Sequence, residues 1–286
     1  IADYLVEEVL AQQAADTRSF LLQTSTLTHF NHDLCRAILA DEAINTQSIL
    51  WELETLSLFL IPLDHERHWF RYHQTFADLL LHQQQQLDPN RLPILYLRAS
   101  RWHEEQNQLP EAMTYALAAG DQTRIAELFE QHGWQLFRSL EYGLLMAWGR
   151  QIPFETASQN SFICAILALA HSLTFRFKES AKWIEATEKS AHSFKPFNIQ
   201  LLDRKFTQQD IEGMRLSAVS FNALFLENFA LAFETAQHVI ALLNEDAHAL
   251  LCGQYIVVGS IQKEMGQYEN AEAALRKAIF HAEAGH

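Results

Sequence analysis

The sequence predicts an all-α protein in which a small winged-helix domain with one β-hairpin precedes an α-solenoid of tetratricopeptide-like helix pairs. The chain has only 9 glycines and 6 prolines among 286 residues, so turn-forming residues are scarce and most of it is expected to be helical. A short β signal lies at residues 58–72, and one spacing of small residues recurs in the C-terminal two thirds of the chain. These observations disfavour all-β folds and glycine-rich phosphate-binding folds.

Residues 1–87 combine short amphipathic helices with the hairpin. Apolar residues three and four positions apart predict helices around Val9, Phe20 and Ile38, and Asn45 begins a segment that can cap a fourth helix. Two apolar runs then flank a polar stretch, and a last helix follows; the three segments are residues 58–63, 69–72 and 74–82. Helices followed by a small hairpin and another helix are typical of a winged-helix domain.

The boundary of this first domain is predicted at residues 82–90, where a glutamine run and Pro89 interrupt the apolar periodicity. Beyond it we expect helices throughout, except for a loop with a short helix at residues 194–210. The most apolar stretch, residues 162–170, predicts a buried helix and is too short to cross a membrane.

Internal repetition is the main evidence for the helix pairs. Phe229, Ala232, Ala236 and Val239 recur 39 positions later as Tyr268, Ala271, Leu275 and Ala278. Two further segments, beginning at Leu109 and more weakly at Phe177, have the same spacing of 0, 3, 7 and 10 positions. Small residues at this spacing allow two helices to cross closely, as they do in tetratricopeptide repeats.

Charge and cysteine usage exclude several classes of function. The formal net charge is −14, and residues 1–87 contain four basic residues against twelve acidic ones, so this winged helix is expected to repel DNA and anionic lipid. Three separated cysteines form no CxxC pair, which fits a reducing cytoplasm. Because the chain starts at Ile1 and stops just after a helix, we expect it to be a piece of a longer protein.

Three strings carry a resemblance to a known family. They are LFLIPLD at residues 58–64, WFRYHQTFADLL at 69–80 and RASRWHEEQNQLPEAMTYALAAGD at 98–121. The chain resembles the ATP-dependent, LuxR-type transcriptional regulators of the MalT class over nearly its whole length. The resemblance implies a winged-helix domain at 1–87, a helical arm at 88–150 and superhelical sensor repeats at 151–286. One departure is Asn107–Gln108, where the family usually has a glycine.

The resemblance also implies a nucleotide-binding domain before this segment and a DNA-binding helix-turn-helix after it. No lysine follows a glycine here, so the segment has no GxxxxGK[ST] phosphate-binding loop. ATP or ADP is therefore expected only in the full-length protein. His73, at the start of the last winged-helix helix, is the position from which related ATPases contact the β-phosphate of ADP. The alternative is a capping or half-buried structural histidine.

Other candidate sites are weaker. Two groups of closely spaced histidines have too few ligands in a suitable spacing to predict a metal site. They are His29 with His32 and Cys35, and His65 with His68. No nucleophile motif surrounds any serine or cysteine, so we do not expect an enzyme. On the first helix of each repeat, polar residues that could bind a ligand or simply face solvent are Arg215, Asn222, Gln254 and Gln262.

The functional hypothesis is a non-catalytic sensing segment. The repeats would bind a small-molecule inducer or a regulatory protein, and the winged helix would contact the nucleotide-binding domain of the same chain. DNA would be bound only through the C-terminal domain that the resemblance implies. The alternative is a stand-alone tetratricopeptide-type scaffold for protein interactions, without a nucleotide switch.

Overall fold

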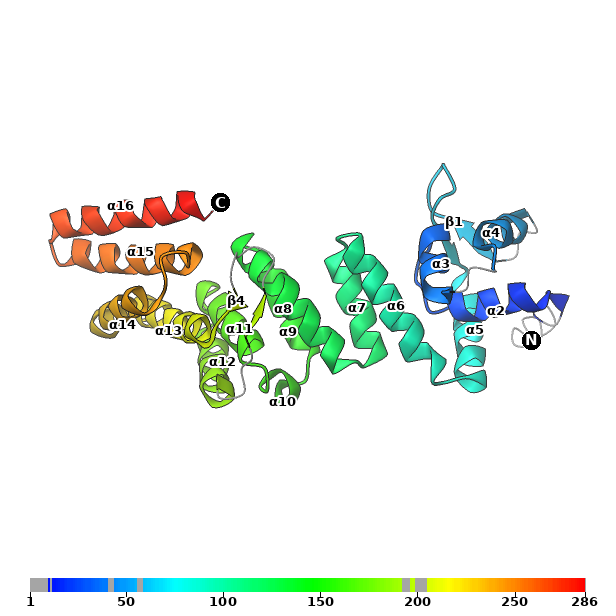
Figure 1. Ribbon diagram of the computed structural model, residues 1–286, viewed down its shortest axis with the longest axis horizontal. Helices are drawn as coiled ribbons and strands as arrows, with labels where there is room; N and C mark the ends of the chain where they lie inside the picture. Colours follow the sequence, from blue (N-terminus) through cyan, green and yellow to red (C-terminus); the bar gives the residue numbers. More distant parts are fainter. Residues whose placement is uncertain are drawn as a thin grey trace. The chain divides into compact units, whose positions relative to one another are not determined.

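A computed structural model describes residues 10, 12–40, 44–55, 59–191, 196–198 and 205–285. The chain divides into two compact units, Ile1–Ile125 and Ala126–His286, whose elements are shown in Figure 1. The helix expected around Val9 lies outside the described residues, apart from Leu10. The division between the units falls inside the segment predicted to be the helical arm, and the three-part domain division stays a prediction.

The first unit contains the expected winged-helix domain. Its helices are α2 (Ala15–Thr24), α3 (His32–Leu39), α4 (Thr46–Thr55) and α5 (Gln74–Leu87), with a hairpin of β1 (Leu60–Pro62) and β2 (Phe70–Tyr72) before α5. Asn31 and Asn45 accept hydrogen bonds from the backbone N–H groups of Leu34 (2.8 Å) and Ser48 (3.0 Å). These bonds satisfy donors that the first turns of α3 and α4 would otherwise leave unpaired.

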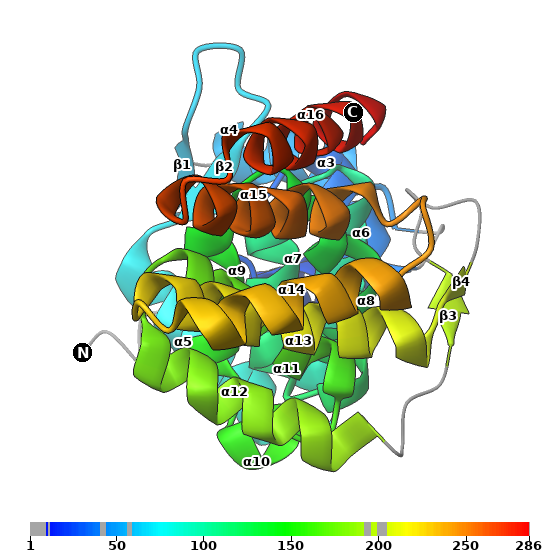
Figure 2. The same ribbon diagram turned by 90° about the vertical axis from the view of Figure 1, so that its left-hand side faces the viewer.

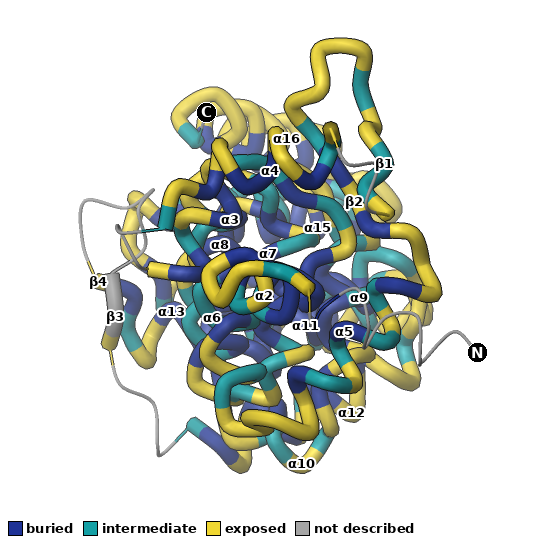
Figure 3. Tube along the Cα trace, turned by 90° about the vertical axis from the view of Figure 1, so that its right-hand side faces the viewer, coloured by how far each residue is buried: buried dark blue, intermediate teal, exposed yellow. Residues whose placement is uncertain are grey.

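The wing connects β1 to β2 and is exposed (Figure 3). The Asp64 carboxylate fixes its turn by accepting hydrogen bonds from the backbone N–H groups of His68 (2.9 Å) and Trp69 (2.8 Å). The bond from His68 is the main reason that the pKa of Asp64 is lowered. At the base of the wing, Phe30 exchanges two 2.8 Å backbone hydrogen bonds with Phe70, which ties the hairpin to the helices.

The hydrophobic core of this unit continues past the winged helix. Helix α6 (Arg91–Glu105) and helix α7 (Leu109–Ala119) form an antiparallel pair, and Leu95, Ala99 and Tyr115 belong to the same buried cluster as the residues of α2–α5. Arg98 donates hydrogen bonds to the carbonyl oxygens of Ile38 (2.7 Å) and Leu39 (3.1 Å) at the end of α3. The glutamine run lies inside α5, so it does not interrupt the helix as the sequence suggested.

Helix α8 (Gln122–Arg138) crosses the division between the units, and the second unit is otherwise built from antiparallel helices. They are α9 (Tyr142–Gln151), the short α10 (Phe154–Ala157), α11 (Ser161–Leu173), α12 (Phe177–Ser190), α13 (Gln208–Phe225), α14 (Phe229–Leu242), α15 (His248–Glu264) and α16 (Tyr268–Ala284). Figure 2 shows α14, α15 and α16 as successive layers. The fold is therefore all-α, with a winged-helix domain followed by tetratricopeptide-like helix pairs.

One turn geometry joins the two helices of every pair. A residue with positive φ lies two positions before the second helix. Its N–H donates to the carbonyl three residues earlier, and the N–H of the next residue donates to the carbonyl five residues before that next residue. This pair of bonds defines a Schellman turn. The positive-φ residues are Asn107 (57°), Leu140 (62°), Phe175 (60°), Glu227 (60°) and Gly266 (74°). Asn107 thus fills the role of the family's usual glycine, because asparagine tolerates this conformation better than most residues.

Close helix crossings explain the recurring small residues. In three pairs a buried serine donates to a carbonyl of the facing helix: Ser100 to Ala112 (2.7 Å), Ser180 to Ala168 (3.0 Å) and Ser220 to Ala232 (3.3 Å). The fourth crossing uses Gly259, where an added Cβ would lie 3.2 Å from the Ala271 carbonyl oxygen. The 39-residue repeat therefore corresponds to the pairs α13/α14 and α15/α16.

Two local expectations have different outcomes. The apolar segment 162–170 is buried inside α11, as predicted. Between α12 and α13 the described residues form a two-residue strand pairing of β3 (Phe197–Asn198) with β4 (Lys205–Phe206). The rest of the segment in which a short helix was expected lies outside the described residues. No helix within the described ranges is both long and apolar enough to span a membrane.

Candidate functional site

His73 lies at the surface, immediately before α5. Its backbone has φ −59° and ψ 135°, its N–H donates to the Phe59 carbonyl oxygen (2.8 Å), and its carbonyl accepts from the Ala77 N–H (3.0 Å). The imidazole makes no capping hydrogen bond and is exposed. The side chain is therefore available to an external group at the positive end of a helix dipole.

The residues around His73 hold its backbone in place. Tyr72, 3% exposed, has its hydroxyl 2.7 Å from the Thr24 hydroxyl, and burial raises the pKa of Tyr72 well above its usual value. The Phe76 ring stacks on the Phe59 ring with centroids 4.6 Å apart. An exposed histidine is thus flanked by buried aromatic residues on β2 and α5, so its position is set by the core.

The four polar candidates of the repeats lie on α13 and α15, the first helices of their pairs. Arg215 forms an ion pair with Glu212 at 2.6 Å, and the hydrogen bonds that its guanidinium donates to that carboxylate are the main reason that the pKa of Arg215 is raised. The Asn222 amide donates to the Ser180 hydroxyl at 2.9 Å, and its carbonyl oxygen is buried without a partner. Both side chains are therefore already partly engaged within the protein.

Gln254 is the unusual member of this set. It occupies the position equivalent to Arg215, 39 residues later, and is fully buried with neither amide atom hydrogen-bonded. The Gln262 amide oxygen is also buried and unpaired. Leaving a buried polar group unpaired costs about 1–3 kcal/mol, so these amides are poorly explained as ordinary core residues.

Sequence reasoning missed two similar groups. The Ser217 hydroxyl on α13 and the Nδ1 atom of His171 on α11 are buried without a hydrogen-bond partner. Burial lowers the pKa of His171. Helix α11 packs on α13, and α13 packs on α15, so the unpaired groups lie on neighbouring first helices. Only the lack of a hydrogen-bond partner distinguishes these buried groups from other buried polar residues, and no sequence pattern indicates that property.

The candidate metal ligands and two of the three cysteines can be placed in the described structure. Within the described ranges, no group of three or more histidine, cysteine, aspartate or glutamate side chains is placed to hold a metal ion. Burial raises the pKa of Cys35 far above its usual value and that of Cys164 to about 12, so these thiols are protonated and unreactive at neutral pH.

Comparison with known proteins extends this description. A family model described as the MalT winged helix domain matches residues 6–92. The HTH-type transcriptional regulator MalT of Vibrio cholerae is 26% identical over 275 residues, which cover 96% of this chain and 29% of that protein. MalT of Klebsiella pneumoniae is 30% identical over 238 residues, covering 80% of this chain and 26% of that protein. The chain thus spans less than a third of these relatives.

A solved structure with a similar fold is a signal transduction ATPase with numerous domains, which carries a tetratricopeptide repeat sensor, from Pyrococcus horikoshii. It matches with a TM-score of 0.55 and 12% identity, covering 99% of this chain and 47% of that one. At this identity the match concerns the fold alone. The winged-helix match and the two MalT relatives show that the chain belongs to the MalT-type family of regulators, of which it contains a winged-helix domain and tetratricopeptide-like helix pairs.

Proposed function

We propose that this chain is the sensing segment of an ATP-dependent, MalT-type transcriptional regulator that works in the cytoplasm. The helix pairs bind a small-molecule inducer or a regulatory protein, and the winged-helix domain contacts the nucleotide-binding domain of the full-length protein. The observation that carries the proposal is the order of parts, a MalT winged-helix domain followed by tetratricopeptide-like pairs. Binding to the pairs shifts the balance between two states of the regulator.

In this proposal His73 donates a hydrogen bond from its imidazole to a phosphate of ADP and favours the resting state. Its exposure and its place before α5 support the role, because an imidazole and the free N–H groups of a helix start can both donate to phosphate. ATP and ADP are bound by the full-length protein, and this segment supplies one contact to them.

The proposed inducer site uses the first helices of the pairs. An unpaired amide such as Gln254 gains a hydrogen bond if a small shift between α13 and α15 opens it to a ligand. That gain offsets the cost of the opening, and it gives the inducer a preference for the shifted state. DNA binding belongs to the separate DNA-binding domain that the family resemblance implies, because the net charge of −14 here repels phosphates.

The test is the substitution His73→Ala in the full-length regulator. A hydrogen bond to a charged group contributes about 1.5–3 kcal/mol, so ADP affinity should fall by roughly one to two orders of magnitude, and transcription without inducer should rise. His82→Ala is the matched control, because His82 is an exposed histidine on α5 whose imidazole bonds only to Gln86 within the described structure. Unchanged ADP affinity and basal transcription in a folded His73→Ala protein would remove His73 from the switch.

A second candidate function, a protein-interaction scaffold, is favoured by an exposed apolar cluster. Phe175 and Phe225 have ring centroids 4.7 Å apart and are 64% and 38% exposed, and Leu226 beside them is 61% exposed. Exposed apolar clusters often mark protein contacts. If the scaffold is the function, Phe175→Ser weakens binding of a protein partner, whereas ADP and His73→Ala have no effect on that binding.

A further inference from the structure

An open cleft lies between α2 and the turn from α5 to α6, with a volume of about 670 Å³. Helix α2 packs on α5 in the same unit (Figure 1). Arg18 and Ser19 contribute from α2, and Arg91 contributes from the start of α6. The volume is within the range of small-molecule sites.

Neither arginine of the cleft forms an ion pair with a carboxylate among the described residues. Within the described structure the Arg18 guanidinium has no hydrogen-bond or ion-pair partner, and the Arg91 guanidinium donates only to the Gln23 amide oxygen, from Nε (3.3 Å) and Nη2 (3.1 Å). Asp88 lines the same cleft, so the lining carries one excess positive charge. Residues 1–125 hold 17 acidic and 8 basic side chains, so a cleft lining with an excess positive charge differs from the net negative charge of this part of the chain.

A third arginine adds to this positive potential. Arg98 lies about two turns after Arg91 on nearly the same face of α6, and its guanidinium donates to the Ile38 and Leu39 carbonyl oxygens at the end of α3. The pKa of Arg98 is lowered, first by burial and then by the positive charge of Arg91. Arg98 therefore adds its positive charge to that of Arg91, and the two charges attract an anion to this side of the unit.

The remaining lining combines hydrogen-bonding groups with an apolar surface. The Ser19 hydroxyl accepts from the Gln23 amide at 2.9 Å, which leaves the hydroxyl hydrogen available to a ligand. Leu22 is buried, whereas Leu87 is 63% exposed. An occupant can therefore combine an anionic group with an apolar part.

We propose that this cleft binds a small organic anion, with a phosphate or carboxylate group held between Arg18 and Arg91 and an apolar part against Leu22 and Leu87. The site is distinct from the proposed nucleotide contact. His73 precedes α5 and Leu87 ends it, so 14 helical residues separate them, or about 20 Å. The cleft also contains no residue of α13 or α15, where the inducer site is proposed, so its failure would leave the proposed function untouched.

The experiment titrates the purified chain with phenyl phosphate and with benzoate by calorimetry at low salt. Saturable binding of either probe supports the site and identifies the preferred anionic group. A charge-assisted hydrogen bond contributes enough that Arg18→Gln and Arg91→Gln should each weaken binding about tenfold. Arg18 is exposed and unpaired, so its replacement should leave the fold intact.

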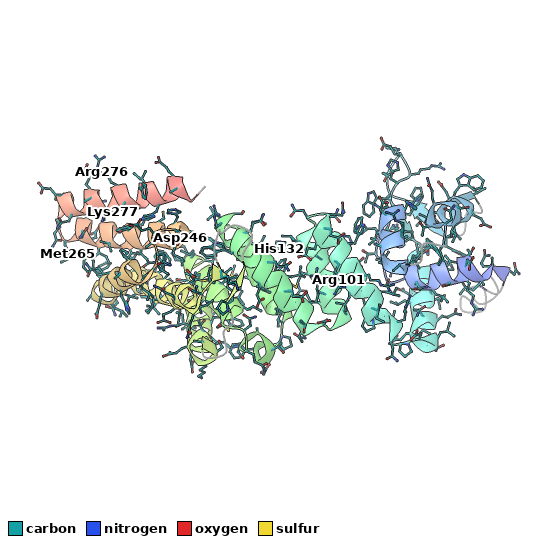
Figure 4. All side chains as sticks on the ribbon, in the orientation of Figure 1. Arg101, His132, Asp246, Met265, Arg276 and Lys277 are labelled. Carbon is teal, nitrogen blue, oxygen red and sulfur yellow. The ribbon has the colours of Figure 1, made fainter. Side chains whose placement is uncertain are left out.

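Arg101→Gln is the matched control. Arg101 is an exposed arginine on α6 (Figure 4) outside the cleft lining, and its replacement removes the same charge from the same unit. Binding of the favoured probe should be unchanged in this variant. The proposal is overturned if neither probe saturates at millimolar concentration, if Arg18→Gln binds as tightly as the unmodified chain, or if Arg101→Gln weakens binding equally.

Discussion

The buried ion pair between Glu104 and Arg124 offers a quantitative test of what holds the first unit together. Arg124, at the start of α8, is 5% exposed; its Nη2 lies 2.5 Å from the Glu104 carboxylate on α6, and its Nε donates to the Ser100 hydroxyl at 3.1 Å. Ser100 in turn bonds to α7 through the Ala112 carbonyl. One cation thus connects three helices.

The expected effect follows from the burial of the pair. Two unit charges about 4 Å apart attract by about 4 kcal/mol at an effective dielectric of 20, and removing one member of a buried pair typically costs about 3–5 kcal/mol because the other charge is left unpaired. Glu104 keeps 18% exposure, and Ser100 still accepts from Arg124. We therefore expect Glu104→Gln to lower the free energy of unfolding by about 3 kcal/mol.

Hydrogen exchange of the backbone amides in α6 and α7 measures this loss in the unit that contains the pair. A loss of about 3 kcal/mol corresponds to roughly 100-fold faster exchange of the most protected amides. The double variant Glu104→Gln/Arg124→Met should lose less than the sum of the two single variants, because it leaves no buried charge unpaired.

An exposed pair of the same geometry is the control. Glu272 and Arg276 are 2.6 Å apart on α16 with side chains 65% and 76% exposed, and Arg276 projects from that helix in Figure 4. Glu272→Gln should leave exchange in its own unit unchanged, because solvent screens such pairs. If Glu104→Gln accelerated exchange less than about fivefold, the buried pair would be as weak as a surface pair and the reasoning would be refuted.

Two further predictions concern a turn and a histidine. Gly266→Ala should lower the free energy of unfolding by about 1 kcal/mol in urea denaturation, because Gly266 has φ 74°, which alanine adopts poorly. The control Gly143→Ala lies in α9 with open space around it and should not destabilise the protein. Equal effects of the two substitutions would contradict this reasoning. His103 is fully buried with Nε2 unpaired, and burial lowers its pKa. In the unfolded chain the histidine takes up a proton near pH 6.5, whereas in the folded protein His103 takes it up only at a lower pH. The folded state therefore loses stability relative to the unfolded state as the pH falls below about 6.5. His103→Gln should therefore lose less stability than the unmodified chain between pH 7 and pH 5, and parallel losses would exclude His103 as a cause.

The repeat spacing in the sequence predicted most, but not all, of the second helices of the pairs. The spacing of 0, 3, 7 and 10 positions correctly located the second helices that begin at Leu109, Phe177, Phe229 and Tyr268. It missed α9, which begins at Tyr142 and has Leu145 where the others have alanine or serine. The pattern reports a close crossing of small residues, so a pair that lacks a small residue at this position is invisible to it.

The candidate sites also differ in how much of each could be predicted from the sequence. The resemblance drew attention to His73, and its position before a helix followed from the hydrophobic pattern. The burial of Gln254 and the missing partners of its amide depend on which helices surround α15, which no local pattern specifies. The cleft of Arg18 and Arg91 joins residues 73 positions apart, so sequence reasoning had no reason to group them.

The sequence by itself determined the helical class, the wing hairpin and most helix pairs, because apolar periodicity and small crossing residues are local properties of a chain. Only the tertiary structure decided that Leu140, Phe175 and Glu227 adopt positive φ. None of these residue types prefers that conformation, which costs about 1–2 kcal/mol relative to a right-handed one. Each adopts it because the packing of two antiparallel helices, together with two backbone hydrogen bonds at the Schellman turn, offsets the local cost.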